Sequence, residues 1–518
     1  MLAKLFSSAV IGVDAYQIEV EVDVAPGLPI FTIVGLPETS VRESKERVKS
    51  AIKNSGYAFP MDRITVNLAP ADIKKDGTGF DLPIAIGLLA ATGVIPPDLL
   101  NSHLLMGELS LDGAVKGVRG ALPAAILCNK NLLAGVIVPS MNGAEASVVD
   151  NISVLPVNHL SEVVDYLRGT GAITPLKTEI GALFSQEPET LDFSEVAGQG
   201  HLKRAIEIAV AGFHNILMIG PPGSGKTMIA RRIPSIMPPM SLNEAIETTK
   251  IFSVSGKLGE REALITQRPF RSPHHTISDA GLIGGGHSPR PGEVSLAHNG
   301  VLFLDEFPEF KKNVLEALRQ PLEDHQVTIA RAAMAISYPS SFMLVGAMNP
   351  CPCGYFSDPR KECLCTPLQI NKYRSKLSGP LLDRIDIHVE APAVPYATLM
   401  KRPMEESSQD IRTRVTATRE IQLKRFHRSK TVANGRMTTR QISLYCQLDQ
   451  ASHSLLISAM ERLGLSARAY NRILKLSRTI ADMEGCPDIS VEHLSEAIQY
   501  RCLDRGVGGA SPAAVEKA

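Results

Sequence analysis

Short apolar runs alternate with amphipathic stretches along most of the chain, and this pattern predicts an α/β fold. Strict alternation from Gln17 to Val24 is typical of a strand with one solvent-exposed face, and a second strand is expected at Ile64–Leu68. A charged helix is predicted from Ser40 to Asn54, and an apolar helix after Asp81. From Thr438 to about Arg501, apolar residues recur at spacings of three and four, which predicts helices.

Three further apolar runs predict buried strands of a parallel sheet, and each ends in residues that carry chemistry. The runs are Asn215–Ile219, Val301–Leu304 and Phe342–Met348. Glycines follow the first run, two acids follow the second, and the amide of Asn349 follows the third. Functional residues are expected in such places because ligands bind outside the carboxyl ends of parallel strands.

The glycine-rich segment after the first strand fits G-x-x-x-x-G-K-[ST], the phosphate-binding loop of NTPases, and a helix is expected to follow it. Glycines let backbone N–H groups close on phosphates, and a helix N-terminus favours negative charge. Lys226 would reach the β- and γ-phosphates, and the Thr227 hydroxyl would hold Mg²⁺. Nucleotide contacts are expected from Gly220, Pro221, Pro222, Gly223, Ser224, Gly225, Lys226 and Thr227.

The ends of the other two strands supply the rest of a hydrolytic site. Asp305 would position Mg²⁺, directly or through water, and Glu306 would polarise the attacking water. Asn349 would hold that water or the γ-phosphate, although an Asn after a strand is also a common turn residue.

Composition limits the class of protein further. The chain has 518 residues, 44% of them hydrophobic, which is enough for two or three domains with real cores. Lys plus Arg equal Asp plus Glu at 54 each, so any basic surface must be local. No apolar run approaches the ~18 residues of a membrane span. The eight cysteines, without a secretory signal, favour reduced thiols in the cytoplasm.

Shifts in pattern divide the chain into five segments. The segment after the first domain carries Gly, Thr and Pro without clear periodicity, and the final segment is rich in Gly and Ala. We expect an α/β domain at 1–170, a linker at 171–190, a P-loop domain at 191–395, a basic linker with a helical lid at 396–505, and a disordered tail at 506–518.

Taken together, these motifs resemble the AAA+ ATPases, within them the magnesium-chelatase-like branch, and most closely the ComM/YifB family of bacterial competence proteins. The matching segments run through nearly the whole chain, at 193–199, 220–227, 300–306, 349–354 and 378–386. The resemblance implies a ring, expected to be a hexamer, that uses ATP and Mg²⁺. Its partner would be single-stranded and branched DNA without sequence specificity, moved as recombination intermediates in natural transformation. It also places Gly198 and Gln199 at the nucleotide.

The first domain resembles the proteolytic domain of Lon-type proteases, an α/β fold. The motifs that carry this resemblance are Lys75–Asp81 and Met106–Gly113. The nucleophile position of that family holds Gly79 here, and the position of the partner lysine falls near Leu122. Because a Ser–Lys dyad needs both groups, we expect a non-proteolytic relative.

Two arginines are candidates for contact with the γ-phosphate. By resemblance, Arg384 would enter the site of the neighbouring subunit and stabilise charge in the transition state. From sequence alone, an arginine between two aspartates fits a surface ion pair equally well. Ser466 is expected to be an N-cap, which puts Arg468 in the first helical turn as the lid's phosphate sensor, with Arg472 as the alternative.

More residues separate the phosphate loop from Asp305 than a minimal core needs, and this excess resembles the pore-loop insert of the helix-2-insert clade. A hairpin is expected around Gln326–Arg331. The alternatives for the insert are a metal site built from its histidines and a solvated loop without function. Candidate contacts to a DNA backbone are Arg271, His274, His275, His287, Arg290 and Arg331.

A cysteine cluster has the spacing C-x-C-x₉-C-x-C and follows Asn349 directly. Four thiolates suit tetrahedral Zn²⁺, although C-x-C is a less common pair than C-x-x-C. Structural zinc and unmetallated reduced thiols both remain open. The cluster consists of Cys351, Cys353, Cys363 and Cys365.

Charge is uneven in one segment, 401–440, where eleven Lys or Arg face four Asp or Glu. Phosphate contact that weakens with salt would explain this excess, and so would a solvated helix beside an acidic neighbour. No motif for sequence-specific DNA recognition is present. Two rival functions stay open: the motor subunit of a magnesium chelatase, which the core motifs alone allow, and an ATP-dependent protease, which Gly79 and Leu122 oppose.

Overall fold

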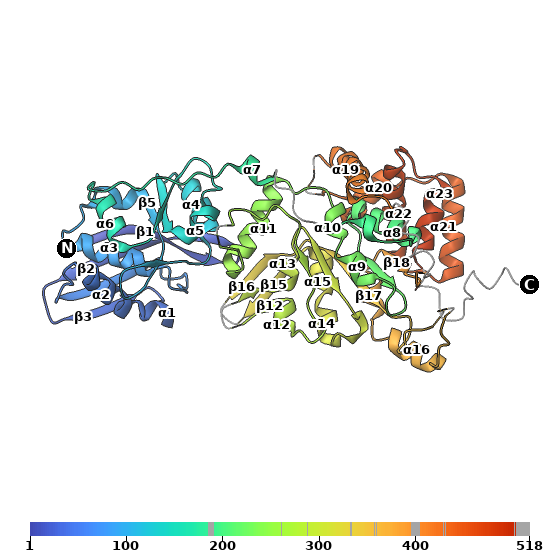
Figure 1. Cartoon of the computed structure of the whole chain (residues 1–518), viewed down its shortest axis with the longest axis horizontal. Coiled ribbons are helices and arrows are strands. Elements are labelled where there is room, and N and C mark those ends of the chain that lie inside the picture. The colour runs from blue at the N-terminus through green and yellow to red at the C-terminus, as the bar shows by residue number, and fades with distance from the viewer. Residues whose placement is uncertain are drawn as a thin grey trace, which may run out of the picture.

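The computed structural model describes residues 1–184, 191–260, 262–286, 289–331, 334–356, 358, 360–394, 405–427, 429, 431–501 and 503. The expected tail at 506–518 and His287 lie outside these residues. The molecule is elongated, with the N-terminal strands at one end and the C-terminal helices at the other (Figure 1). Among the described residues, no helix combines the length and apolarity that crossing a bilayer requires.

A seven-stranded sheet in the order β3-β4-β2-β1-β5-β8-β9 forms the N-terminal unit. The predicted alternation is confirmed, because Ile18, Val20 and Val22 of β2 are buried while the residues between them are partly exposed. The strands are β1 (Leu2–Ile11), β2 (Asp14–Ala25), β3 (Ile30–Val34), β4 (Arg63–Ala69), β5 (His103–Leu105), β8 (Gly135–Pro139) and β9 (Ser153–Val157), with a small β6 (Glu108–Leu109) and β7 (Val115–Lys116) pair.

Helices cover this sheet. The apolar helix α3 is buried along its whole length, and at Gly87 it approaches β2 so closely that a Cβ would lie 2.6 Å from Val22 Cγ2. The predicted charged helix is present as α1 and α2. The helices are α1 (Thr39–Arg42), α2 (Ser44–Asn54), α3 (Asp81–Ala91), the 3₁₀ turn η1 (Pro97–Ser102), α4 (Ala121–Lys130), α5 (Ser140–Ala146), α6 (Leu160–Leu167) and α7 (Ile180–Phe184).

A second sheet of five parallel strands, in the order β11-β14-β17-β10-β18, forms the centre of the molecule. Its middle strands are fully buried because helices cover both faces, which confirms the three apolar runs as strands. The strands are β10 (Ile216–Ile219), β11 (Phe270–Arg271), β14 (Val301–Leu304), β17 (Met343–Met348) and β18 (Ile387–Glu390).

The helices of this central unit fall before and between its strands. They are η2 (Phe193–Glu195), α8 (Gly200–Gly212), α9 (Lys226–Ala230), α10 (Ile233–Ile236), α11 (Leu242–Ser255), η3 (Phe307–Glu309), α14 (Lys312–Ala317), α15 (Arg319–Asp324), α16 (Pro367–Arg374) and α17 (Gly379–Leu382).

Two hairpins leave the central sheet and lie beside one another. The first, β12 (Gly284–Gly285) with β13 (Arg290–Pro291), stands between α12 (Asp279–Leu282) and α13 (Glu293–Leu296). The second is the predicted hairpin, β15 (Gln326–Arg331) with β16 (Met334–Pro339). Tyr338 Oη donates to the Pro289 carbonyl at 2.7 Å, which joins the two hairpins.

The C-terminal region is helical, as predicted from its spacing, and it shares a hydrophobic core with one face of the central sheet. The Ser466 side chain accepts a hydrogen bond from Ala469 N, which confirms the predicted N-cap. The helices are α19 (Ser408–Arg425), η4 (Asn434–Arg436), α20 (Thr439–Tyr445), α21 (Gln450–Leu463), α22 (Ala467–Met483) and α23 (Val491–Gln499).

The N-terminal unit and the central unit touch at several places, and two of them are hydrophobic. Ile11 and Val13, at the tip of the β1–β2 hairpin, pack against the hydrophobic cluster that contains β15 and β16. Ile180 and Leu183 of α7, inside the segment expected as a linker, pack with Val148 of the N-terminal unit and residues of α11. The second hairpin therefore lies directly against the N-terminal unit (Figure 1).

Candidate functional site

The glycine-rich loop has the geometry of a phosphate cradle. Gly223 and Gly225 have φ of 75° and 85°, a left-handed region that glycine enters without strain. Lys226 begins α9, and its Nζ donates to the carbonyls of Gly220 at 2.7 Å and Pro221 at 2.9 Å. Burial lowers the pKa of Lys226 to about 8. A polyphosphate in the loop would counteract that shift, since opposite charge favours the ammonium.

The two expected magnesium ligands meet at the carboxyl ends of β10 and β14. Thr227 Oγ1 donates to Asp305 Oδ2 at 2.6 Å. Asp305 Oδ1 in turn accepts the backbone N–H of Glu306 at 2.9 Å, so the carboxylate is held in place. A hydroxyl and a carboxylate are oxygen donors of the kind that Mg²⁺ prefers, so these residues fit a nucleotide-bound magnesium ion.

Glu306 and Asn349 share the wall of one cavity next to the phosphate loop, with a volume of about 450 Å³. Glu306 has a left-handed φ of 51°, and its carboxylate lies 3.3 Å from His275 Nδ1. Sequence reasoning missed the opposite wall, because nothing in the spacing connects α16 to this site. The residues on that wall include Gln369, Lys372, Tyr373 and Lys376.

Gly198 and Gln199 lie behind the phosphate loop, where the resemblance places them. Gln199 Nε2 donates to the Ser224 carbonyl at 2.7 Å and to the Pro392 carbonyl at 2.9 Å. The Gly198 N–H donates to Glu405 at 2.7 Å. Glu405 comes from far along the chain, and sequence reasoning did not find it.

Arg384 and Arg468 lie at the amino ends of the central strands, whereas the phosphate loop lies at the carboxyl ends. Arg384 precedes β18 and is 4% exposed, paired with Glu323. Arg468 Nη1 is 4.0 Å from Asp383, and its side chain is 59% exposed. Strands β10 and β18 are parallel neighbours of four residues each, so about 13 Å of strand separates these arginines from the loop.

The alternative sensor, Arg472, holds a buried carboxylate. Its Nη1 donates to Asp386 Oδ1 at 2.5 Å, and Asp386 also accepts the Asn215 N–H at 3.0 Å. Burial alone would raise the pKa of Asp386, but Arg472 and nearby His214 hold it well below its ordinary value. Arg472 therefore joins α22 to the central sheet.

The candidate DNA contacts fall into different surroundings. Arg271 donates to both carboxylate oxygens of Glu293, at 2.6 and 2.9 Å, and His274 Nδ1 lies 2.9 Å from Thr276 Oγ1. Arg290 is exposed on β13. Arg331 ends β15, but its side chain lies outside the part of the chain that the structure describes.

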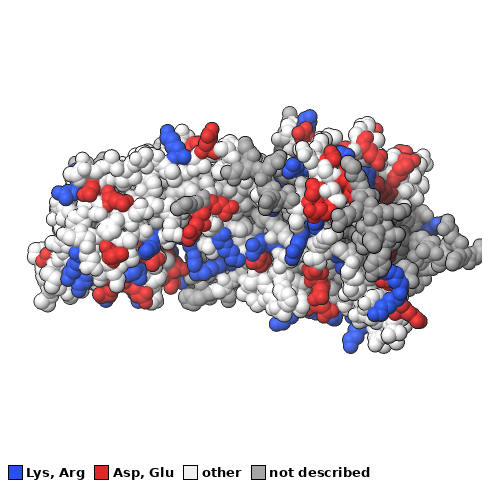
Figure 2. All heavy atoms as spheres, viewed as in Figure 1, with Lys and Arg blue, Asp and Glu red and all other residues white. Residues whose placement is uncertain are grey.

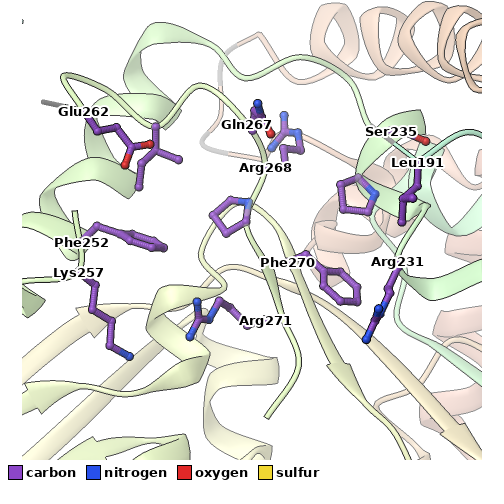
Figure 3. Close-up of a pocket in the computed structure, with 13 residues that line it drawn as sticks. Leu191, Arg231, Ser235, Phe252, Lys257, Glu262, Gln267, Arg268, Phe270 and Arg271 are labelled. Atoms are coloured by element: carbon purple, nitrogen blue, oxygen red, sulfur yellow. The ribbon is translucent and has the colours of Figure 1, made fainter. Parts of the chain in front are cut away.

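A second cavity, of about 400 Å³, lies between α10, α11 and β11 (Figure 3). Its lining includes Arg231, Lys257, Arg268 and Arg271. Glu293 holds both Lys257 and Arg271, while Arg268 pairs with Glu244. Carboxylates of this chain thus compensate much of the charge in this cavity.

Several of the described arginines at 401–440 have partners inside the chain. Arg419 donates to the carbonyls of Val210 and Ala211, and Arg425 pairs with Asp482 at 2.5 Å. Arg436 Nη2 donates to the Phe342 carbonyl at 2.7 Å. A count of charges could not reveal this, because it does not show which cations are buried and bonded to neighbouring helices. Residues 401–404, 428 and 430 lie outside the description.

The four clustered cysteines come together in space. Their Sγ atoms all lie within 4.8 Å of one another. Cys351 Sγ is 3.3 Å from Cys353 Sγ and 3.7 Å from Cys363 Sγ, and the latter two are 3.6 Å apart. A tetrahedral ion with Zn–S bonds of 2.3 Å requires sulfurs about 3.8 Å apart. The donor set thus fits zinc.

In the N-terminal unit, Gly79 and Leu122 occupy the positions where the Lon resemblance expects nucleophile and lysine. A Cβ on Gly79 would lie 3.8 Å from Val118. Leu122 is fully buried, and its N–H donates to Glu145 at 3.3 Å. These two positions therefore contribute no Ser or Lys side chain.

A phosphate loop, oxygen ligands for Mg²⁺ and an acid beside an amide, all on one edge of a five-stranded parallel sheet, define a P-loop ATPase of the magnesium-chelatase-like type. Three family models match in succession: "Subunit ChlI of Mg-chelatase" at 20–142, "Magnesium chelatase, subunit ChlI" at 192–399, and "Magnesium chelatase, subunit ChlI C-terminal" at 405–501.

Similarity to whole proteins is more specific. Competence protein ComM of Haemophilus influenzae and YifB of Salmonella typhimurium are each 44% identical to this chain, over 97% of it and 98% of their own length. The magnesium-chelatase subunit ChlI of Cyanophora paradoxa is 21% identical, over 60% of this chain and 89% of its own length. The chain therefore belongs to the ComM/YifB family.

Proposed function

We propose that the chain is an ATP-driven, ring-forming DNA motor that moves branched recombination intermediates during natural transformation. The observation that carries this proposal is the pair of hairpins, β12–β13 and β15–β16, which pack side by side, the second of them against the N-terminal unit. Competence, the activity named for the Haemophilus relative, is the uptake of DNA, which gives such hairpins a substrate.

Positive charge supports a nucleic-acid partner at this junction. Lys and Arg gather in the middle of the face shown in Figure 2, near the meeting of the two units. Arg119 of the N-terminal unit has its pKa lowered by burial and by Arg290 of the first hairpin. A DNA phosphate would reduce the repulsion between these two cations. Binding of this kind weakens as salt rises.

The residues at the phosphate loop divide the work of hydrolysis. The loop amides and Lys226 bind the β- and γ-phosphates, and Thr227 and Asp305 hold Mg²⁺, which would neutralise charge on the phosphate oxygens. Glu306 orients the attacking water, and Asn349 faces it from the adjoining strand. Each of these groups follows a strand at the same edge of the sheet, so their positions are fixed by the sheet itself.

The arginines at the amino ends of the strands act on the neighbouring subunit. Since Arg384 and Arg468 stand together and far from their own phosphate loop, a ring places both against the γ-phosphate of the next chain. Arg384 must exchange Glu323 for that phosphate, so nucleotide in the neighbour competes with an ion pair of this chain. The expected assembly is a homo-hexamer in the cytoplasm.

Two further assignments accompany the motor. The N-terminal unit is a non-proteolytic relative of the Lon-type domain, since Gly79 and Leu122 stand at the dyad positions, and the C-terminal helices form the lid. The four clustered thiols bind one structural Zn²⁺, supported by their sulfur spacing.

The deciding experiment mixes the protein with a four-way or three-strand DNA junction, ATP and Mg²⁺. We expect the junction to move, and ATP hydrolysis to rise with single-stranded or branched DNA. Assembled, ATPase-active protein that neither binds DNA at low salt nor moves a junction would refute the motor.

The second candidate is the motor subunit of a magnesium chelatase, favoured by the names of the three matching family models. Its relatives with that name are far more distant, at 21–23% identity. ATP hydrolysis stimulated by a porphyrin-binding partner, and not by DNA, would support it.

A further inference from the structure

The cysteine-bearing loop joins β17 to α16 and touches the phosphate loop on its way. Gly354, within it, has a left-handed φ of 85°. A Cβ on this glycine would lie 2.6 Å from Pro222 Cδ and 3.8 Å from Asn349 Cγ. The loop is therefore packed at the point where the phosphate loop and Asn349 meet.

Helix α16 returns to that point from the far end of the same loop. Arg374 Nε donates at 3.2 Å to the carbonyl of Pro350, the residue after Asn349. Tyr373 and its neighbour Lys372 form part of the cavity wall that faces Glu306 and Asn349. The position of α16 thus determines the shape of the space beside the γ-phosphate.

The cysteines stand at both ends of this loop and close it. Cys351 and Cys353 follow Asn349, while Cys363 and Cys365 precede α16. The Phe356 N–H donates to Cys351 Sγ at 3.4 Å, the kind of backbone contact that orients a metal-binding thiolate. One ion bound by all four sulfurs would cross-link the end of β17 to the start of α16.

We propose that Zn²⁺ held by these four cysteines positions the γ-phosphate wall of the ATP site, so that the ion controls the rate of hydrolysis and not only the stability of a surface loop. The inference rests on the ATPase and the zinc site proposed above, and it adds a role for the metal in turnover. Without the ion, the loop loses its closure, and Asn349 and α16 lose their fixed separation from the phosphate loop.

The test compares purified protein with a variant carrying Cys363→Ser and Cys365→Ser, in the absence of DNA. Zinc should fall from about one ion per chain to near none. We expect kcat to fall about 10-fold or more, as for outer-shell partners of a catalytic group, while nucleotide affinity changes less than about 3-fold. The affinity is spared because the phosphate loop and Gln199 do not depend on the ion.

Two further variants separate positioning from folding. Cys486→Ser, a half-buried cysteine outside the cluster, should keep zinc and kcat. Gly354→Ala retains all four thiols but places a methyl group against Pro222, so it should keep zinc and lower kcat. Removing zinc from the wild-type protein with a chelator should lower kcat, and adding Zn²⁺ should restore it. Size-exclusion chromatography verifies that each variant still assembles.

Several outcomes would overturn the proposal. They are wild-type protein without zinc, loss of zinc in Cys486→Ser, full activity after zinc removal, and an unchanged kcat in Gly354→Ala. Because turnover is measured without DNA, a protein that fails to move junctions but needs zinc for hydrolysis would refute the motor and leave this inference standing. Junction movement by fully active zinc-free protein would support the motor and refute this inference.

Discussion

At the scale of the residue, burial and partners separate side chains that look equivalent in the sequence. Arg468 and Arg472 are one turn apart on α22, yet the first is 59% exposed and the second is tied to the buried Asp386. Glu306 follows Asp305 directly, but its carboxylate turns toward His275 of the insert. Residue type sets what a group can do, and its surroundings determine which role it takes.

Glu306 and Lys226 make the most direct prediction. Glu306→Gln should bind ATP but hydrolyse it roughly 10²–10³-fold more slowly, because the amide cannot polarise water as the carboxylate does. Lys226→Ala should lose productive nucleotide binding. Equilibrium binding of a fluorescent nucleotide and a phosphate-release assay measure the two effects. Turnover by Glu306→Gln at the wild-type rate would remove this residue from the mechanism.

The two arginines of α22 should separate activity from stability. Arg468→Ala should reduce ATP hydrolysis with little change in thermal unfolding, since the side chain is exposed in the single chain. Arg472→Ala should destabilise the fold by roughly 3–5 kcal/mol, because it removes the arginine that pairs with the buried Asp386. Calorimetry and ATPase assays on both variants provide the comparison, and the opposite pattern would exchange their roles.

At the scale of the element, the hairpins are attached to the ATP site through short connections. The segment between β11 and α12 carries His275, which contacts Glu306, and then leads into the first hairpin. The second hairpin begins after α15 and ends before β17, whose carboxyl end carries Asn349. Each hairpin thus shares a strand connection with a residue of the hydrolytic site, and under the proposed function this connection would link bound DNA to turnover.

Arg290 and Arg271 form a matched pair for testing this link. Arg290→Ala should lower DNA-stimulated turnover more than basal turnover, because this side chain is exposed on the hairpin. Arg271→Ala, whose side chain is held by Glu293, should affect DNA stimulation less. ATPase titrations with single-stranded DNA at low and high salt measure both. Equal loss of DNA stimulation in the two variants would place the contact elsewhere.

At the scale of the whole molecule, the phosphate loop and the two candidate γ-phosphate arginines stand at opposite ends of the central strands. The phosphate loop follows β10, whereas Arg384 precedes β18. The proposed closed ring would join the two parts of the site from adjacent copies, because a head-to-tail contact repeats until the last chain meets the first. The N-terminal unit and the C-terminal helices lie on opposite sides of the central unit (Figure 1).

Mixed rings test the shared site. Arg384→Ala and Lys226→Ala chains should each be inactive alone, but mixing them should restore some hydrolysis. The reason is that some interfaces then combine an intact phosphate loop with an intact Arg384. ATPase activity against mixing ratio, with assembly followed by light scattering, gives the measurement. A mixture as inactive as its components, although co-assembled, would place Arg384 outside the neighbour's site.

The junction of the central sheet with the C-terminal helices should be sensitive to acid. Burial, followed by Arg436 and other cations, lowers the pKa of His325 to about 3 from an ordinary value of 6.5. Between those values the unfolded chain binds a proton that the folded chain does not, so stability falls as pH decreases below 6.5. The thermal midpoint should drop from about pH 7 to about pH 5, and drop less in His325→Gln. Identical slopes would contradict this origin.

The sequence by itself determined the strands of the central sheet, the phosphate loop, the acids after β14 and the family. These features are local: a buried strand needs a run of apolar residues, and a phosphate cradle needs glycines at fixed spacing. It also placed four cysteines on one loop, but their convergence was decided only by the fold.

Only the tertiary structure decided which cations face outward, because a charge count does not identify their partners. Asp482, the partner of Arg425, lies 57 positions away in the chain. The tertiary structure alone brought α16 to the γ-phosphate wall and set Arg384 and Arg468 at the amino ends of the central strands, opposite the phosphate loop. Those arrangements depend on contacts between residues distant in sequence, which periodicity and spacing do not encode.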